Sequence, residues 1–409
     1  MAGRDVGGEA RHFGLKQLAK KNARIFDLGN WVLSLYFTWF SFQGISFRIA
    51  RLEGHHTMAP FGLDFSTVTL EGLLYSKPEW ETQICLALCH SVVWYLLLNW
   101  ILPPLITSLI RGMRTKDQFL LMNKRTFKSM MMWDMGEDQE FILSQVAMFE
   151  GVIVQHGVGG ALTVPSVLGL GALLPPGVAS AMARHGGLCE SGWEIEDTLV
   201  RVGQVLFGGE VGLAKNPVPL RIMLAMHHSA AQCLVIPLNV LYPDNAYYHE
   251  GIFLLQAAAV IAFLMQQWGF TLDIKTRTGL AQMRFSVGVS WIVIMWSRVV
   301  RYGFVWYKLM SLFQADGSFA FRLCLPPVVF MSLFNLAIIG DCTAKLVKFF
   351  SMSLEEHDHH ELEHAAMQCL NSPRHCRPPA SFGITKAHAE WAKIRGAVKM
   401  AAVMHHKGA

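Results

Sequence analysis

Charged residues are scarce in this chain: Asp, Glu, Lys and Arg make up 16% of its 409 residues. Soluble globular domains carry about 25% charged residues, so the shortage argues against a soluble protein. Apolar residues reach 52%, and the mean hydropathy is +0.33. The same numbers exclude a disordered chain, a coiled coil and a collagen. The composition therefore predicts an all-α membrane protein that crosses the bilayer several times.

Several familiar chemical motifs are also missing. None of the eight cysteines stands in a CxxC pair, which leaves no disulfide framework and no zinc ribbon. The sequence has no Walker A loop, no dinucleotide-binding glycine motif ahead of a βαβ unit and no GxSxG serine elbow. We therefore expect no bound cofactor. The net charge is only +5, and we expect no nucleic-acid partner.

Eight segments are apolar over about 20 residues, the length that a helix needs to cross a bilayer. The two segments within 141–183 are the weakest, because Pro165, Pro175 and Pro176 would equally suit a re-entrant pair. The glycine-rich stretch 157–171 is typical of close helix packing. The predicted spans are Trp31–Ala50, Ile84–Ile110, Phe141–Val158, Leu162–Ala183, Val218–Val240, Tyr248–Phe270, Met283–Tyr307 and Leu323–Lys345.

Basic loops alternate with acidic or mixed loops along the predicted spans. Under the positive-inside rule, this alternation requires an even number of spans and places both termini in the cytosol. The predicted organisation is a basic cytosolic arm at 1–30, a first span and luminal-side loop at 31–83, a transmembrane bundle at 84–350 and a polar cytosolic tail at 351–409.

An unusual polar segment, 186–217, lies between the fourth and fifth predicted spans. Its acidic residues precede an apolar stretch, 198–213, that is too short to span a bilayer comfortably. We therefore predict an interfacial helix at 198–213. The acidic residues are Glu190, Glu194, Glu196 and Asp197.

A pair of histidines, His227 and His228, lies inside the fifth predicted span. Ionisable residues at bilayer depth are rare and usually face the bundle interior. Adjacent helical residues point about 100° apart, so the two rings cannot face one spot. One of them is a candidate general base, and the alternative is a pair of hydrogen-bonded residues that join helices. Asn335 and Asp341, in the eighth span, are expected to make interhelical hydrogen bonds.

Two further polar pairs lie inside predicted spans. Glu150 and His156 are six residues apart, which places them on different helix faces. Glu150 either partners a histidine on another helix or lies at a thinned, hydrated depth of the bilayer. Arg298 and Arg301 lie towards the end of the seventh span. They either extend their charges to the interface or form an anion site for the phosphate of a lipid or of acyl-CoA.

The polar tail contains the string His360-Glu361-Leu362-Glu363-His364, which matches H-E-x-x-H. This pattern places two zinc ligands one helical turn apart in metalloproteases. The surroundings are acidic and polar, and no third ligand follows at a protease spacing. The tail is therefore a weak metal candidate, with incidental metal binding and a solvated helix face as alternatives. No metal site is predicted within the membrane.

Polar motifs follow a distinct order through the last four predicted spans. His227-His228 is followed by a span that opens at Tyr248–Gly251, a polar link at 272–277, a span with Arg298 and a final helix from Met331 to Lys345. In this order the chain resembles the TLC-domain family, the membrane fold shared by ceramide synthases and several lipid-related proteins. The resemblance implies a TLC-like bundle over about 84–350.

The resemblance is incomplete at the acidic positions. Ceramide synthases carry a His-Asp pair and a further Asp in the span after the His-His pair, whereas residues 254–260 of this chain contain no acid. An acyl transfer that depends on those carboxylates would lack its orienting partner here. Members without the acidic motif look more like modulators or sensors of membrane lipid composition.

Three hypotheses for the function remain open. The first is a protein that binds or senses a lipid of acyl-chain or sphingoid type inside the bundle. The second is an acyl-CoA-dependent N-acyltransferase, with acyl-CoA as co-substrate and His227 or His228 as base. The third is a transporter or a structural subunit of a membrane assembly. Membrane lipids are the expected partners, a homo-oligomer is left open, and the expected location is the endoplasmic reticulum or another endomembrane. The candidate lipid contacts are His227, His228, Glu150, His156 and Arg298.

Overall fold

The computed structural model describes residues 64–131 and 133–352. Helices make up 87% of the structure, and these residues contain no strand, which confirms the all-α prediction. The basic arm, the predicted first span and the tail with His360 and His364 lie outside the described residues. The helices are α2 (Leu70–Leu74), α3 (Trp80–Leu96), α4 (Leu102–Gly112), α5 (Lys116–Met131), α6 (Gln139–Val167), α7 (Val178–Phe207), α8 (Gly209–Lys215), α9 (Val218–Leu241), α10 (Ala246–Phe270), α11 (Arg277–Met295), α12 (Tyr302–Asp316) and α13 (Ser318–Ser351).

Short helical segments of other kinds complete the chain. Two π-helical segments join α3 to α4 and α11 to α12, so that each pair forms one long helical stretch. The 3-10 segments are η1 (Phe65–Thr67) and η3 (Leu170–Leu173), and the π-helical segments are η2 (Leu97–Ile101) and η4 (Trp296–Arg301).

Six helical stretches in the described part of the chain are long and apolar enough to cross a membrane. This finding rests on their length and composition. Each contains most of one predicted span, so hydropathy located six of the eight expected segments. The stretches are Trp80–Gly112, Gln139–Val167, Val218–Leu241, Ala246–Phe270, Arg277–Asp316 and Phe321–Ser351.

The prediction for 141–183 is wrong in its boundaries. Helix α6 continues through the glycine-rich stretch to Val167 and contains Pro165, so the glycines do not separate two helices. The predicted span Leu162–Ala183 instead contains a turn, in which Gly169 and Gly177 have φ of 68° and 80°. A left-handed backbone of this kind is strained for a residue with a Cβ, and it reverses the chain between α6 and α7.

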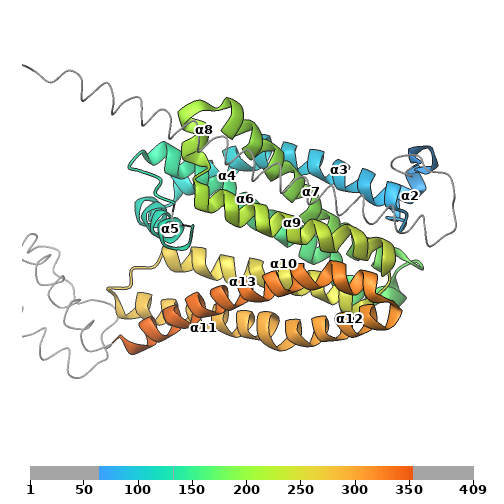
Figure 1. The fold of residues 1–409 in the computed structure, drawn as a ribbon. Helices are drawn as coiled ribbons and strands as arrows, with labels where there is room; N and C mark the ends of the chain where they lie inside the picture. The colour runs from blue at the N-terminus through green and yellow to red at the C-terminus, as the bar shows by residue number, and fades with distance from the viewer. Residues whose placement is uncertain (1–63, 132, 353–409) are drawn as a thin grey trace, which may run out of the picture. The chain divides into compact units, whose positions relative to one another are not determined.

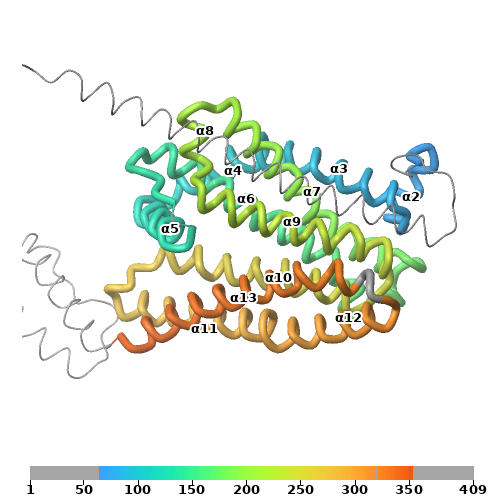
Figure 2. The backbone as a smooth tube through the Cα atoms, in the orientation of Figure 1, coloured from blue at the N-terminus to red at the C-terminus, as the bar shows by residue number. Residues whose placement is uncertain are grey.

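The predicted boundaries of the interfacial helix at 198–213 are also wrong. Residues 198–207 form the last part of α7, which is 30 residues long, and the acidic residues before them lie within the same helix. Helix α8 follows, and Figure 2 shows the chain reversing there before α9. Helix α7 is absent from the apolar set above because a stripe of buried charged residues lowers its hydropathy.

The described residues form two compact units, one of 64–260 with 295–337 and one of 261–294 with 338–352. In the first unit, α7 packs against α3, α6 and α9 (Figure 1). Close approach depends on glycine. A Cβ on Gly186 would lie 2.7 Å from the Gly159 carbonyl oxygen, and a Cβ on Gly160 would lie 3.0 Å from the Ala257 backbone nitrogen. These contacts confirm close packing as the role of the glycine-rich stretch.

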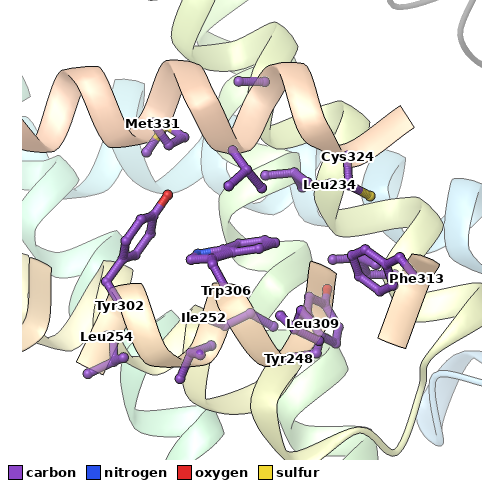
Figure 3. Packing of buried hydrophobic residues seen from close by; sticks show 14 residues of the cluster. Leu234, Tyr248, Ile252, Leu254, Tyr302, Trp306, Leu309, Phe313, Cys324 and Met331 are labelled. Atoms are coloured by element: carbon purple, nitrogen blue, oxygen red, sulfur yellow. The ribbon is translucent and has the colours of Figure 1, made fainter. Parts of the chain in front are cut away.

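The largest apolar core of this unit lies around α12 (Figure 3). Tyr302, Trp306, Leu309 and Phe313 follow one another at intervals of four, three and four residues, which places them on one face of the helix. They pack with residues of α9, α10 and α13, among them Leu234, Ile252, Cys324 and Met331.

The second unit has a smaller apolar cluster of Leu272, Leu280, Met283 and Phe349. Two side-chain bonds reinforce it: Arg284 Nε donates to the Phe349 carbonyl oxygen at 3.0 Å, and Trp291 Nε1 donates to Thr343 Oγ1 at 3.1 Å.

Candidate functional site

Helix α7 carries three carboxylates on one buried stripe. Glu190, Glu194 and Asp197 are spaced by four and three residues, so they lie on the same face of the helix. Their residues are 9%, 1% and 8% exposed, respectively. Buried carboxylates are costly unless they are paired or hydrogen-bonded, so their partners determine what the stripe does.

His227 on α9 lies opposite the first two carboxylates. Its Nε2 is 3.7 Å from Glu190 Oε1 and 3.7 Å from Glu194 Oε1, and one ligand atom from each residue lies within 4.8 Å of the others. The imidazole is 19% exposed, whereas the Glu194 side chain is fully buried. His227 is therefore the more accessible member of this pair.

Two neutral amides hold the other oxygen of each glutamate. Gln155 Nε2 on α6 donates to Glu190 Oε2 at 3.2 Å, and Gln232 Nε2 on α9 donates to Glu194 Oε2 at 3.1 Å. Both carboxylates are thereby oriented with Oε1 towards His227. Within the described part of the chain, Glu194 Oε1 and His227 Nδ1 are buried without a hydrogen-bond partner.

His228 belongs to a separate network. Its Nε2 is 3.7 Å from Asp197 Oδ2, and its Nδ1 lies 3.0 Å from Thr198 Oγ1. Asp197 also accepts a hydrogen bond from Arg201 Nε at 2.7 Å, and Arg201 donates to Asn216 at 2.9 Å. The two histidines thus face different carboxylates, as expected for neighbouring residues on a helix.

His156 on α6 joins the group from another side. Its Nδ1 lies 3.1 Å from the Val152 carbonyl oxygen, which only accepts, so this nitrogen carries the proton. In the neutral ring, Nε2 then presents a lone pair, and it lies 3.9 Å from Glu190 Oε1. Glu150 makes no hydrogen bond or ion pair with these described residues.

Arg298 lies inside the bundle, which contradicts the expectation that it extends to the interface. It is 8% exposed, its Nη2 donates to the Leu255 carbonyl oxygen at 2.7 Å, and its Nη1 donates to Asn335 at 3.4 Å. The interhelical hydrogen bond predicted for Asn335 is thereby confirmed.

Arg301 and Asp341, two further charged residues of the predicted spans, each form an ion pair. Arg301 makes a two-pronged ion pair with Glu250 on α10, at 2.7 and 2.8 Å, instead of extending to the interface. Asp341 pairs with Lys345 one turn along its own helix, at 2.6 Å, so the interhelical bond expected for it is replaced by an intrahelical one.

The carboxylates of α7 are the residues that sequence reasoning missed. The family resemblance places such acids in the span after the His-His pair, where residues 254–260 of this chain contain none. The structure instead places carboxylates of α7, the helix before the pair, beside both histidines. The available signal was the spacing of positions 190, 194 and 197, which is that of one helix face.

A histidine flanked by buried carboxylates can act as a positioned general base, relay a proton or complete a cation site. No protein-family model, curated protein or solved structure matches this chain. Its function must therefore be inferred from the geometry of the site.

Proposed function

We propose that this chain is a multi-pass membrane protein that binds the polar part of a lipid inside its helix bundle, at His227. The observation that carries the proposal is the group of imidazoles and carboxylates from α6, α7 and α9 in a bundle whose other helices are mostly apolar. Ionisable groups at bilayer depth are costly and usually mark a functional site. The partial exposure of His227 gives a ligand a place to approach.

The lipid class follows from the surroundings. Apolar helices suit an acyl chain, and the imidazole with its flanking carboxylates suits a polar head that donates or accepts hydrogen bonds. A lipid of acyl-chain or sphingoid type has both parts. The order of motifs from His227 to Lys345 supports a TLC-like bundle and, with it, an endomembrane location. The alternation of basic and acidic loops supports cytosolic termini.

Lipid retention tests this proposal. We expect the purified protein to retain a lipid that mass spectrometry detects, and His227→Asn to lose most of it. His185→Asn is the matched control, because His185 lies on α7 but contacts the Leu74 carbonyl oxygen and His90 instead of the carboxylates. Equal retention by wild type and His227→Asn, with both proteins folded, contradicts the proposal.

A second function, acyl transfer, is favoured by one specific observation. The carboxylates needed to orient a catalytic histidine are present on α7, although they are absent from 254–260. In this reaction the nitrogen of a long-chain amine attacks the thioester carbonyl of acyl-CoA. The C–N bond forms and the C–S bond breaks, while His227 takes a proton from the nitrogen and passes it to the leaving sulfur, so that CoA leaves as the thiol.

The acyltransferase is tested by incubating the protein with acyl-CoA and a long-chain amine. We expect an amide product from wild type and none from His227→Asn. Absence of product over a range of chain lengths, from protein that still retains lipid, would leave the binding function and exclude catalysis.

A further inference from the structure

Three side-chain atoms converge on one point between α7 and α9. His227 Nε2 is 3.7 Å from Oε1 of both Glu190 and Glu194. Zinc bonds of about 2.0–2.2 Å place the ligand atoms of a tetrahedral site about 3.4 Å apart. The two separations from His227 exceed this edge by a few tenths of an ångström, and the three ligand atoms all lie within 4.8 Å of one another, so rotations of the side chains could close the site. We propose that Glu190, Glu194 and His227 bind one divalent transition-metal ion.

A buried atom without a partner points to the same position. Glu194 is 1% exposed, and among the residues that the structure describes its Oε1 has no hydrogen-bond partner, although it faces His227. A buried polar atom without a hydrogen-bond partner destabilises the folded protein, and more so when the group is charged. A cation bound to this oxygen removes that cost.

The surroundings of the two glutamates match those of a metal site. Metal-binding carboxylates are themselves held by hydrogen bonds from a second layer of residues. Gln155 and Gln232 donate to the Oε2 atoms and leave both Oε1 atoms directed at His227. Because the donors are neutral amides, they orient the carboxylates without cancelling their charge.

The local charge favours a divalent ion over a single proton. Two glutamates that are both ionised would place a charge of −2 around the position, and a single proton cancels only half of it. A divalent ion cancels all of it, which matters most where water is excluded. The nearby cation, Arg298, donates to the Leu255 carbonyl oxygen and to Asn335 instead of to these carboxylates.

The ligand set indicates which metal binds. One imidazole and two carboxylates suit zinc better than calcium or magnesium, which prefer oxygen ligands alone. Three protein ligands leave a fourth position open, as in catalytic zinc sites. The open fourth position suits an oxygen of a polar lipid head. With the ion bound, the lipid head would contact the ion instead of the His227 imidazole. The metal site itself does not depend on lipid binding.

Zinc content of the delipidated full chain tests the proposal. The polar tail is a second zinc candidate, so all variants carry alanine at His357, His359, His360 and His364, and no polyhistidine tag is used. We expect about one zinc ion per chain after removal of loose metal. Glu194→Gln preserves the shape of the side chain. We expect it to weaken zinc binding at least tenfold, because losing even a residue that only holds a metal ligand typically costs about 10- to 100-fold in metal affinity.

Glu196→Gln is the matched control. Glu196 lies on the same helix and is also buried, but it accepts a hydrogen bond from Asn99 at 2.7 Å and is not part of the convergent group. We expect it to bind zinc as the parent does. Calcium and magnesium at equal concentration should not displace the zinc.

Three results overturn the metal site: no bound zinc in folded parent protein, equal zinc loss from Glu194→Gln and Glu196→Gln, or displacement of zinc by calcium. The lipid proposal fails separately, because lipid retention is measured on protein purified without delipidation. Zinc binding without lipid retention leaves the metal site intact, and lipid retention without zinc binding refutes the metal site alone.

Discussion

Gly192 offers a sharp test of the packing that positions the site. It lies on α7 between Glu190 and Glu194 in sequence, but about 200° away from each around the helix, on the face towards α3. A Cβ added there would lie 2.4 Å from His90 Cβ, 2.7 Å from the His90 carbonyl carbon and 2.8 Å from the Ser91 nitrogen. Two of these three atoms are backbone, so a change of side-chain rotamer cannot relieve the contact.

The expected loss for Gly192→Ala follows from these distances. Ordinary contacts of a Cβ lie at 3.4–4 Å, so α3 and α7 must move apart by about 1 Å. Overpacking of this kind costs about 1–3 kcal/mol. Because the shift also carries the glutamates, we expect weaker zinc binding and lower lipid retention from a residue that touches neither ligand.

Thermal unfolding in detergent measures the effect, with Gly203→Ala as control. Gly203 lies on the same helix, and a Cβ added there would have nothing within 4 Å, so alanine should stabilise the helix by up to about 1 kcal/mol. An unfolding temperature for Gly192→Ala equal to or above that of Gly203→Ala would refute the close packing of α3 on α7.

Two further predictions concern other parts of the molecule. Trp306→Ala should cost about 3–5 kcal/mol of unfolding free energy, because Trp306 is buried in the α12 core, whereas the exposed Trp296 should tolerate alanine; thermal unfolding of both variants decides this. The double variant of Arg301→Met and Glu250→Gln should lose less unfolding free energy than the two single variants lose together, and the difference in a double-mutant cycle should be about 1–3 kcal/mol. If the single losses add up to that of the double variant, the ion pair contributes nothing.

Hydropathy located most of the bundle because a spanning helix needs one long apolar run, and that requirement is local in sequence. It failed at α6 and α7 for two physical reasons. In the sequence, the glycines and Pro165 resemble the end of a helix, but α6 continues through them and packs its glycines against neighbouring helices. The charges of α7 lowered its hydropathy, although other helices cover them.

The candidate site was predictable in part. His227 and His228 stood out because histidine at bilayer depth is rare. Their partners did not, because which helix packs against α9 is a tertiary property that one sequence does not encode locally. Arg298 shows the same limit: its position near the end of a span favoured the interface, yet the Leu255 carbonyl and Asn335 hold it inside.

The most direct test of lipid binding at His227 is an experimental density map of the protein in lipid nanodiscs, at a resolution that shows side chains. We predict elongated non-protein density inside the bundle, with its polar end at His227 beside Glu190 and Glu194. A map in which these side chains are well resolved, but no density other than protein lies beside His227, would contradict the proposed function.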